Sequence, residues 1–288
     1  MSQALTDLSA QLASAFKSAC LAEIEALKPG NVHIFANGHG MVVQDFIKSA
    51  EAAAGVIAQP DLTVGQRIAF AIEATWNAAG CNTNLGIVLL CAPLIHAVLH
   101  GKNPTLPERL QEVLQGLTVA DAALAFQAIL RASPAGLGES ARHDVHAPPS
   151  VTLLEAMAEA QQRDRIALQY VTGFADVFDG VKRYEETLQR WGRPAWAATA
   201  VYLGFLAGIA DTHIVRKYGE AAALAVCEEA KAHEQALLAL ENPKTYQRNL
   251  LKYDADLKAR GLNPGTSADL TVASLLLATL KKDAVVKI

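Results

Sequence analysis

Apolar residues recur at helical spacing along most of the chain. Between residues 5 and 27, for example, Leu8, Leu12, Phe16 and Ile24 are separated by multiples of four. This period places them on one face of a helix. Good helix formers dominate, and runs of alternating β-branched residues are missing. The pattern therefore predicts an all-α protein.

Proline and glycine punctuate this pattern and set the limits of the predicted helices. The expected helical ranges are 5–27, 44–57, 62–79, 87–99, 110–130, 151–162, 165–178, 180–191, 195–219, 221–240, 243–260 and a last apolar helix ending at residue 280. Thr63 is expected to cap one helix, and Thr118 or Asp121 another. We detect no internal repeat, and we expect one compact multi-helical domain over residues 1–288.

The chain has 288 residues, of which 51% are hydrophobic, and a formal net charge of −4. That charge argues against a nucleic-acid partner, which would require a basic face. The cysteines are scattered and indicate neither a disulfide framework nor a zinc site. No signal peptide is evident, and the uncharged runs are too short or too interrupted for a membrane span. We expect a cytoplasmic protein with small-molecule partners, and a homodimer is possible.

The segment 195–219 combines an apolar first half with a charged second half. Asp211, His213, Arg216 and Lys217 fall within about two helical turns of one another. A helix end explains part of this pattern, because Arg216 and Lys217 would complement the helix dipole and Gly219 would supply the cap. It does not explain Asp211 and His213. A site at this helix end is the alternative.

Further polar loops follow other apolar helices, at residues 28–45, 80–86, 136–146 and 263–269. Each has a structural alternative. Asn82, Thr83 and Asn84 could cap the helix that follows them, and the loop bearing Asp144 could be a surface connection instead of a lid. No phosphate-binding Walker loop, dinucleotide fingerprint or His-Glu-x-x-His motif occurs.

Taken together, the loops resemble the triphosphoribosyl-dephospho-coenzyme A synthase family. The resembling motifs are Lys28-Pro29-Gly30 followed by Asp45 and Ser49, Asn82-Thr83-x-x-Gly86, Asp211-Thr212 with a basic residue before Gly219, and Pro264-Gly265-x-x-Ala268-Asp269-Leu270. The resemblance implies an all-α enzyme that joins ATP to dephospho-coenzyme A through a ribosyl linkage and releases adenine. The product is the precursor of the prosthetic group of citrate and malonate decarboxylases.

One motif departs from the family pattern. Where members usually have His followed by Lys or Arg, this chain has Asn84-Leu85. It is similar in this respect to a divergent branch in archaea and in methylotrophic bacteria that use methanopterin-type cofactors. Two alternatives therefore stay open beside the family reaction. One is another transferase or ligase step in methanopterin- or methanofuran-type cofactor biosynthesis, and the other is a non-catalytic helical binding protein.

The resemblance and the chemistry of the reaction suggest roles for individual residues. Displacement of adenine builds positive charge on the ribose, the attacking hydroxyl needs a base, and the phosphates of ATP need cations and Mg²⁺. The catalytic candidates are Asp45, Asp211, Asp269, His39 and Asp144, of which Asp211 and Asp269 are also candidate ligands of Mg²⁺. The substrate-binding candidates are Lys28, Gly30, Asn31, Asn82, Thr83, Asn84, His143, His213, Arg216, Lys217, Asn263 and Gly265. For each aspartate the alternative role is that of a helix cap.

Overall fold

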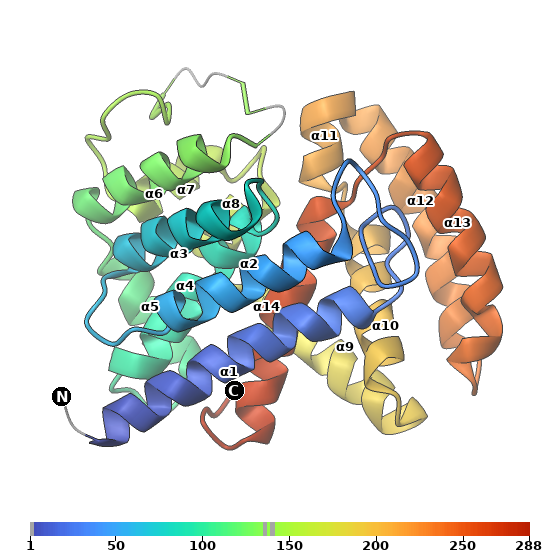
Figure 1. Ribbon diagram of the computed structural model, residues 1–288, viewed down its shortest axis with the longest axis horizontal. Coiled ribbons are helices and arrows are strands. Elements are labelled where there is room, and N and C mark those ends of the chain that lie inside the picture. The colour runs from blue at the N-terminus through green and yellow to red at the C-terminus, as the bar shows by residue number, and fades with distance from the viewer. Residues whose placement is uncertain (1–2, 135–136, 139–141) are drawn as a thin grey trace. The chain divides into compact units, whose positions relative to one another are not determined.

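The computed structural model describes residues 3–134, 137–138 and 142–288, and within these ranges it is built from helices without any strand (Figure 1). The only bridges there are two isolated ones, between His33 and Ala36 and between Gly38 and Met41. The prediction of an all-α fold is confirmed.

Most observed helices lie within a few residues of the predicted ranges. They are α1 (Gln3–Glu25), α2 (Val43–Ile57), α3 (Val64–Ala79), α4 (Leu85–His100), α5 (Leu106–Gln115), α6 (Val119–Ala132), α7 (Leu153–Ala160), α8 (Arg165–Thr172), α9 (Ala175–Trp191), α10 (Pro194–Gly208), α11 (Thr212–Tyr218), α12 (Glu220–Leu238), η1 (Pro243–Tyr246), α13 (Gln247–Ala259) and α14 (Gly265–Lys282).

The chain forms two compact units. Unit 1 comprises Met1–Ser18, Asp45–Ala175 and Thr279–Ile288, and unit 2 comprises Ala19–Gln44 and Asp176–Ala278. One domain over residues 1–288 stays a prediction.

The prediction of a helix over residues 165–178 is wrong. Gly173 and Phe174 both have positive φ angles, 64° and 65°, and end α8. The next helix, α9, continues through Gly180, which had been expected to mark a boundary. Glycine is required there by packing, because an added Cβ would lie 2.2 Å from Oγ of Ser274 on α14.

In unit 1, α4 is apolar on nearly all sides and almost wholly buried. Pro93 lies inside this helix and cannot donate a hydrogen bond to the carbonyl of Leu89. The hydroxyl of the buried Tyr170, on α8, donates to that carbonyl at 2.7 Å instead. The proline is therefore tolerated because a distant side chain replaces the missing donor.

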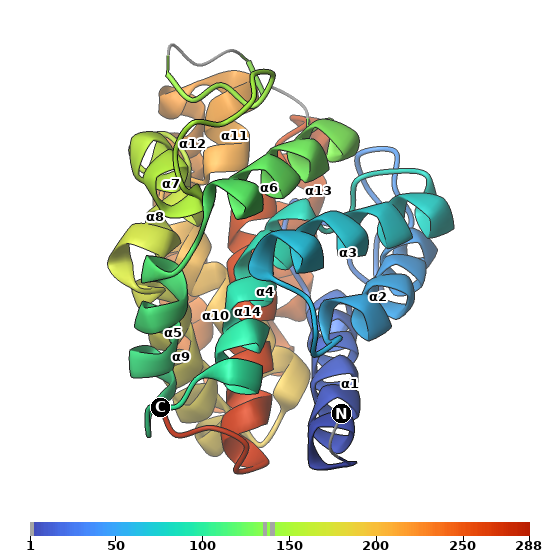
Figure 2. The same ribbon diagram turned by 90° about the vertical axis from the view of Figure 1, so that its left-hand side faces the viewer.

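The helices α3 and α6 of unit 1 pack side by side, as Figures 1 and 2 show. Their contact is tight at Gly65, where an added Cβ would lie 2.5 Å from Cα of Asp121. The Asp121 carboxylate accepts from the N–H of Gly65 at 2.8 Å and from the N–H and hydroxyl of Thr118. It thus stabilises the first turns of both helices. The predicted caps Thr63 and Thr118 are confirmed.

A buried arginine closes the C-terminal end of α2 in unit 1. Arg67 is fully buried and donates to the carbonyls of Ile57 at 2.8 Å and Pro60 at 3.2 Å, and also to that of Gln59. Its Nε lies 3.4 Å from Nδ1 of His96. Burial and, to a smaller extent, the neighbouring cation of Arg67 lower the pKa of His96 to about 4.

We expect this histidine to make unit 1 sensitive to acid. The pKa of His96 in the folded chain lies below the ordinary value of 6.5, so the unfolded chain binds the proton first as the pH falls. The free energy of unfolding should therefore fall by about 1 to 3 kcal/mol between pH 6.5 and 4, after allowance for partial exposure, and should not change through this group above pH 6.5. Urea unfolding of the wild type and of His96→Gln at a series of pH values measures this difference. Equal pH dependence of the two proteins would exclude it.

In unit 2, α10 and α12 pack against each other around an apolar core. Tyr202, Leu203 and Leu206 of α10 and Val226 of α12 are fully buried in it. The predicted helix over residues 243–260 is divided into η1 and α13, and Leu250, Tyr253, Asp254 and Leu257 of α13 are buried.

No single helix in the described ranges is long and apolar enough to cross a membrane. Two bent pairs, α5 with α6 (94°) and α10 with α11 (49°), reach the required length and composition only when each pair is taken together.

Candidate functional site

The Lys28-Pro29-Gly30 turn follows α1 in unit 2 and is held by α10. The hydroxyl of Thr199 accepts from the N–H of Leu27 at 3.1 Å, and the hydroxyl of Tyr202 donates to the carbonyl of Pro29 at 2.7 Å. Both contacts are buried. The proline and glycine of the turn are therefore fixed in position by hydrogen bonds from the core.

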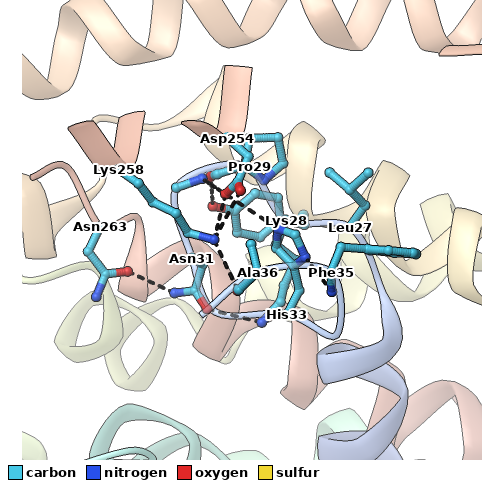
Figure 3. Close-up of polar contacts among 12 residues, drawn as sticks. Leu27, Lys28, Pro29, Asn31, His33, Phe35, Ala36, Asp254, Lys258 and Asn263 are labelled. Atoms are coloured by element: carbon cyan, nitrogen blue, oxygen red, sulfur yellow. Dashed lines mark hydrogen bonds and ion pairs between the residues drawn. The ribbon is translucent and has the colours of Figure 1, made fainter. Parts of the chain in front are cut away.

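Lys28 lies at the centre of a buried polar group that we call the Lys28 network, formed by Glu23, Lys28, Asn31 and Asn263. Its Nζ contacts Glu23 and donates to Oδ1 of Asn31 at 3.0 Å. Asn31 in turn donates to Oδ1 of Asn263 at 2.8 Å (Figure 3). Burial lowers the pKa of Lys28 and raises that of Glu23, while their mutual attraction opposes both shifts. Lys28 has no exposed surface.

A second polar group, which we call the Asp254 network, is formed by His33, Asp254 and Lys258 and holds the other side of the same turn. Asp254 on α13 accepts from the N–H of Gly30 at 2.9 Å and forms an ion pair with Lys258 at 2.9 Å. Nε2 of His33 lies 3.3 Å from the same carboxylate, and Lys258 also donates to the carbonyl of Ala36 at 3.1 Å (Figure 3). Burial lowers the pKa of His33, which favours the neutral ring.

The two most specific motifs of the sequence meet here. Gly30 has a φ of 84°, and an added Cβ would lie 2.8 Å from Cδ of Pro264. At the neighbouring Gly265 an added Cβ would lie 2.2 Å from Nδ1 of His213. Both glycines are therefore required by close packing, and the structure brings together Lys28, Asn31, Asn263 and His213 from the predicted set.

Asp211 is buried and joins the N-termini of two helices. Its Oδ1 accepts from the N–H groups of His213 at 3.0 Å and Ile214 at 3.4 Å, in the first turn of α11. Its Oδ2 accepts from both the N–H and the hydroxyl of Ser267 in α14 at 2.8 Å. Burial raises the pKa of Asp211, and these hydrogen bonds oppose the shift. The alternative role that the sequence offered, a helix cap, accounts for all four contacts.

Asp269, two residues after Ser267 on α14, is half-buried. Its charge raises the pKa of both Lys28 and Cys20, so it lies near the Lys28 network. On α11, Arg216 is half-buried and Lys217 is exposed. Burial and, to a smaller extent, these two cations lower the pKa of His213 to about 4.

His39 belongs to the same unit and touches the Lys28-Pro29-Gly30 turn. Its Nε2 lies 2.7 Å from the carbonyl oxygen of Gly30. The residue has a positive φ of 55°, and Gly40 follows with 77°. The ring also lies close enough to His213 to lower its pKa.

Three of the predicted residues of unit 1, Asn82, Thr83 and Asn84, form a polar group at the N-terminus of α4. Asn82 accepts from the N–H of Leu85 at 3.1 Å and caps the helix. Thr83 donates to Ser49 at 2.6 Å, and Ser49 donates to the carbonyl of Asp45. Asn84 donates to Thr75 at 2.9 Å, while its buried Oδ1 makes no hydrogen bond to any described residue. Helix capping thus explains Asn82 but not Thr83 and Asn84.

The loop before α7, also in unit 1, carries His143 and Asp144. The Asp144 carboxylate accepts from the N–H of His146 at 2.8 Å and contacts its ring nitrogen at 2.6 Å. His143 has a φ of 51°. Gly136 and residues 139–141 of this predicted loop lie outside the described residues.

Four residues of the two networks were not predicted from the sequence, namely Glu23, His33, Asp254 and Lys258. A signal for two of them exists. Glu23 continues the apolar stripe of α1 that includes Phe16, and Asp254 lies on the stripe of α13 between Leu250 and Leu257. An acidic residue on an apolar stripe is a buried charge that needs a partner.

A bound metal can be tested against the donor atoms present. Among the described residues no group of three or more His, Cys, Asp or Glu side chains could hold a metal ion. Each Asp211 oxygen already accepts two hydrogen bonds, which uses the lone pairs of a carboxylate. A closed protein site for Mg²⁺ therefore does not fit. An ion held mainly by phosphates, with one carboxylate such as Asp269, would fit.

Comparisons with known proteins agree with the motifs. A family model described as ATP:dephospho-CoA triphosphoribosyl transferase matches residues 9–287. A crystal structure of a candidate triphosphoribosyl-dephospho-CoA synthase from Archaeoglobus fulgidus has a similar fold, with a TM-score of 0.62 and 21% sequence identity, covering 80% of this chain and 96% of that one. No curated protein matches the chain by sequence.

Proposed function

Because the chain belongs to the ATP:dephospho-CoA triphosphoribosyl transferase family, we propose that the two turns meeting in unit 2 bind a nucleotide substrate of that reaction. The protein is a transferase. In the family reaction ATP and dephospho-coenzyme A give triphosphoribosyl-dephospho-coenzyme A and adenine. The family match does not favour the two alternatives, a different cofactor-forming step and a non-catalytic binding protein.

One observation supports placing the site in unit 2. The Lys28-Pro29-Gly30 turn and the Pro264-Gly265 turn pack against each other at Gly30, where an added Cβ would lie 2.8 Å from Cδ of Pro264. Gly265 makes its own close approach to His213, and the side chain of Asn31 donates to Asn263, 232 residues away in the chain. Glycine lets the backbone approach a neighbour that any side chain would block. Such a rigid junction is suited to orienting a substrate.

We propose distinct roles for the charged groups around this junction. Arg216 and Lys217 would contact phosphates, whereas the buried Lys28 would stabilise the turn. Mg²⁺ would enter with ATP and use Asp269 as its protein ligand. In unit 1, Asp45, Asn82, Thr83, Asn84, His143 and Asp144 stay candidate substrate contacts. Asp211 as a catalytic or metal-binding group, a cytoplasmic location and a homodimer also stay predictions.

We expect adenine release from ATP and Mg²⁺ that depends on dephospho-coenzyme A. The product should have the mass of both substrates minus adenine, because the new ribosyl bond replaces the bond to the base. Lys217→Gln should raise KM for ATP by about tenfold, since one charge-assisted phosphate contact contributes about 1.4 kcal/mol. Chromatography of adenine and mass spectrometry of the product measure both effects.

The matched control is Lys182→Gln on α9, an exposed lysine paired with Asp179. It should leave KM unchanged. Release without an acceptor would indicate hydrolysis of ATP at the ribose instead of transfer. No release from folded protein would refute the proposal, and methanopterin-type precursors would then be the acceptors to test.

A further inference from the structure

His39 has a backbone conformation that is unfavourable for residues other than glycine. It lies in the tight turn closed by the N–H of Met41 and the carbonyl of Gly38 at 3.0 Å, with a φ of 55°. A non-glycine residue in this region is strained, and such strain concentrates at functional sites. The turn places the ring of His39 against the carbonyl of Gly30. Gly30 belongs to the Lys28-Pro29-Gly30 turn, which contributes Lys28 to one buried network and donates to Asp254 in the other.

The contact with Gly30 determines which ring nitrogen carries the proton. A carbonyl oxygen only accepts, so Nε2 of His39 must be the donor in the 2.7 Å hydrogen bond. In the neutral ring the lone pair therefore lies on Nδ1. No hydrogen bond between Nδ1 and another described residue is present, and the side chain is only half-buried. The ring thus offers a basic nitrogen in a fixed tautomer.

The surroundings of the ring suit a reaction between nucleotides. His213 lies near His39, has a pKa of about 4 and stays neutral at pH 7. Arg216 and Lys217 place positive charge near His213, so anionic phosphates would be attracted to this side of unit 2. His39 and His213 therefore differ in setting, and only His39 has its tautomer fixed by a backbone carbonyl.

We infer that Nδ1 of His39 is the general base that deprotonates the attacking ribose hydroxyl of the acceptor nucleotide, with the Gly30 carbonyl as its positioning group. This inference rests on the proposed function. The hydroxyl proton moves to Nδ1, and the oxygen forms a bond to the anomeric carbon of ATP. The bond from that carbon to adenine breaks, and its electron pair leaves with the base. Adenine takes a proton from water, and His39 returns its proton to water.

Two substitutions separate this role from a structural one. His39→Gln places an amide N–H where Nε2 donates to Gly30 but has no basic nitrogen. His39→Gly fits the positive φ and leaves room for free imidazole. We expect both variants to lower kcat for acceptor-dependent adenine release by about 10²- to 10⁴-fold, the usual contribution of a general base. The acid limb of the pH–rate profile should disappear in His39→Gln. Imidazole should restore part of the activity of His39→Gly.

Each result decides the inference. A His39→Gln variant with kcat within about threefold of the wild type and an unchanged acid limb would overturn it, and would show that only the bond to Gly30 matters. Failure of imidazole to restore a folded His39→Gly variant would also count against it. If His39→Gln does not fold, as judged by circular dichroism, His39→Gly with imidazole decides alone. Absence of adenine release from the wild type would instead refute the proposed function itself.

Discussion

Replacing Asp211 with alanine is expected to lower the free energy of unfolding by about 3 to 5 kcal/mol, since a buried hydrogen-bonded carboxylate is removed from two helix ends. The N–H groups of His213, Ile214 and Ser267 would lose their acceptor, and water cannot replace it easily at a position that is 1% exposed. Asp211→Asn should cost less, because the amide oxygen can still cap α11. Some loss should remain, since the amide N–H would face the N–H of Ser267. Urea unfolding of both variants measures the two losses.

Asp164 provides a matched control for this effect. It caps α8 through the N–H groups of Ile166 at 2.8 Å and Ala167 at 3.3 Å. Asp164→Ala should therefore cost only about 1 kcal/mol, the usual contribution of an N-cap. If Asp211→Ala were no more destabilising than this control, the bridging role of the carboxylate would be wrong.

A change with a similarly large effect is Lys28→Met. It removes the cation from a pair that is fully buried, leaving Glu23 at 3% exposure without its partner. Removing one member of a buried ion pair typically costs about 3 to 5 kcal/mol, because the remaining charge keeps its desolvation penalty. The pKa of Glu23, already raised by burial, should rise further in this variant. Equilibrium unfolding at several pH values measures both changes.

The double variant Glu23→Leu with Lys28→Met tests the reason for the loss. In this variant two apolar side chains replace the buried ion pair, and such replacements are often neutral or stabilising. Stability should therefore return, while a substrate-binding role of Lys28 would leave activity low. Lys17→Met, which breaks the exposed pair with Glu51, should cost less than about 1 kcal/mol. Equal losses in Lys17→Met and Lys28→Met would contradict the importance of burial.

The helices could be predicted because their signals are local. Thr63 accepts from the N–H of Gln66, three residues away, and Thr118 does the same for Asp121. The apolar period of α1 and the proline and glycine that follow it are equally local. The helix boundary predicted at Gly180 was wrong for the opposite reason. That glycine is required by its close packing against Ser274, which is 94 residues distant in the chain.

The site was predictable as a set of motifs but not as an arrangement. The resemblance pointed to Lys28, Gly30, Asn263 and Gly265. Close packing now explains both glycines, because Gly30 lies against Pro264 and Gly265 lies against His213. The resemblance did not reveal that Lys28 is buried against Glu23, or that Asp211 serves two helices at once. A carboxylate that caps one helix and a carboxylate that joins two look alike in a sequence.

The sequence by itself determined the helical class, most helix limits and the family, because these depend on residues within a few positions of each other or on short motifs. Only the tertiary structure decided which charged residues are buried together. Gly30 and Asp254 are 224 residues apart in the chain, yet the backbone nitrogen of Gly30 lies 2.9 Å from Oδ1 of Asp254. The pKa of a buried group depends on such distant neighbours, since desolvation and nearby charges act through space and not along the chain.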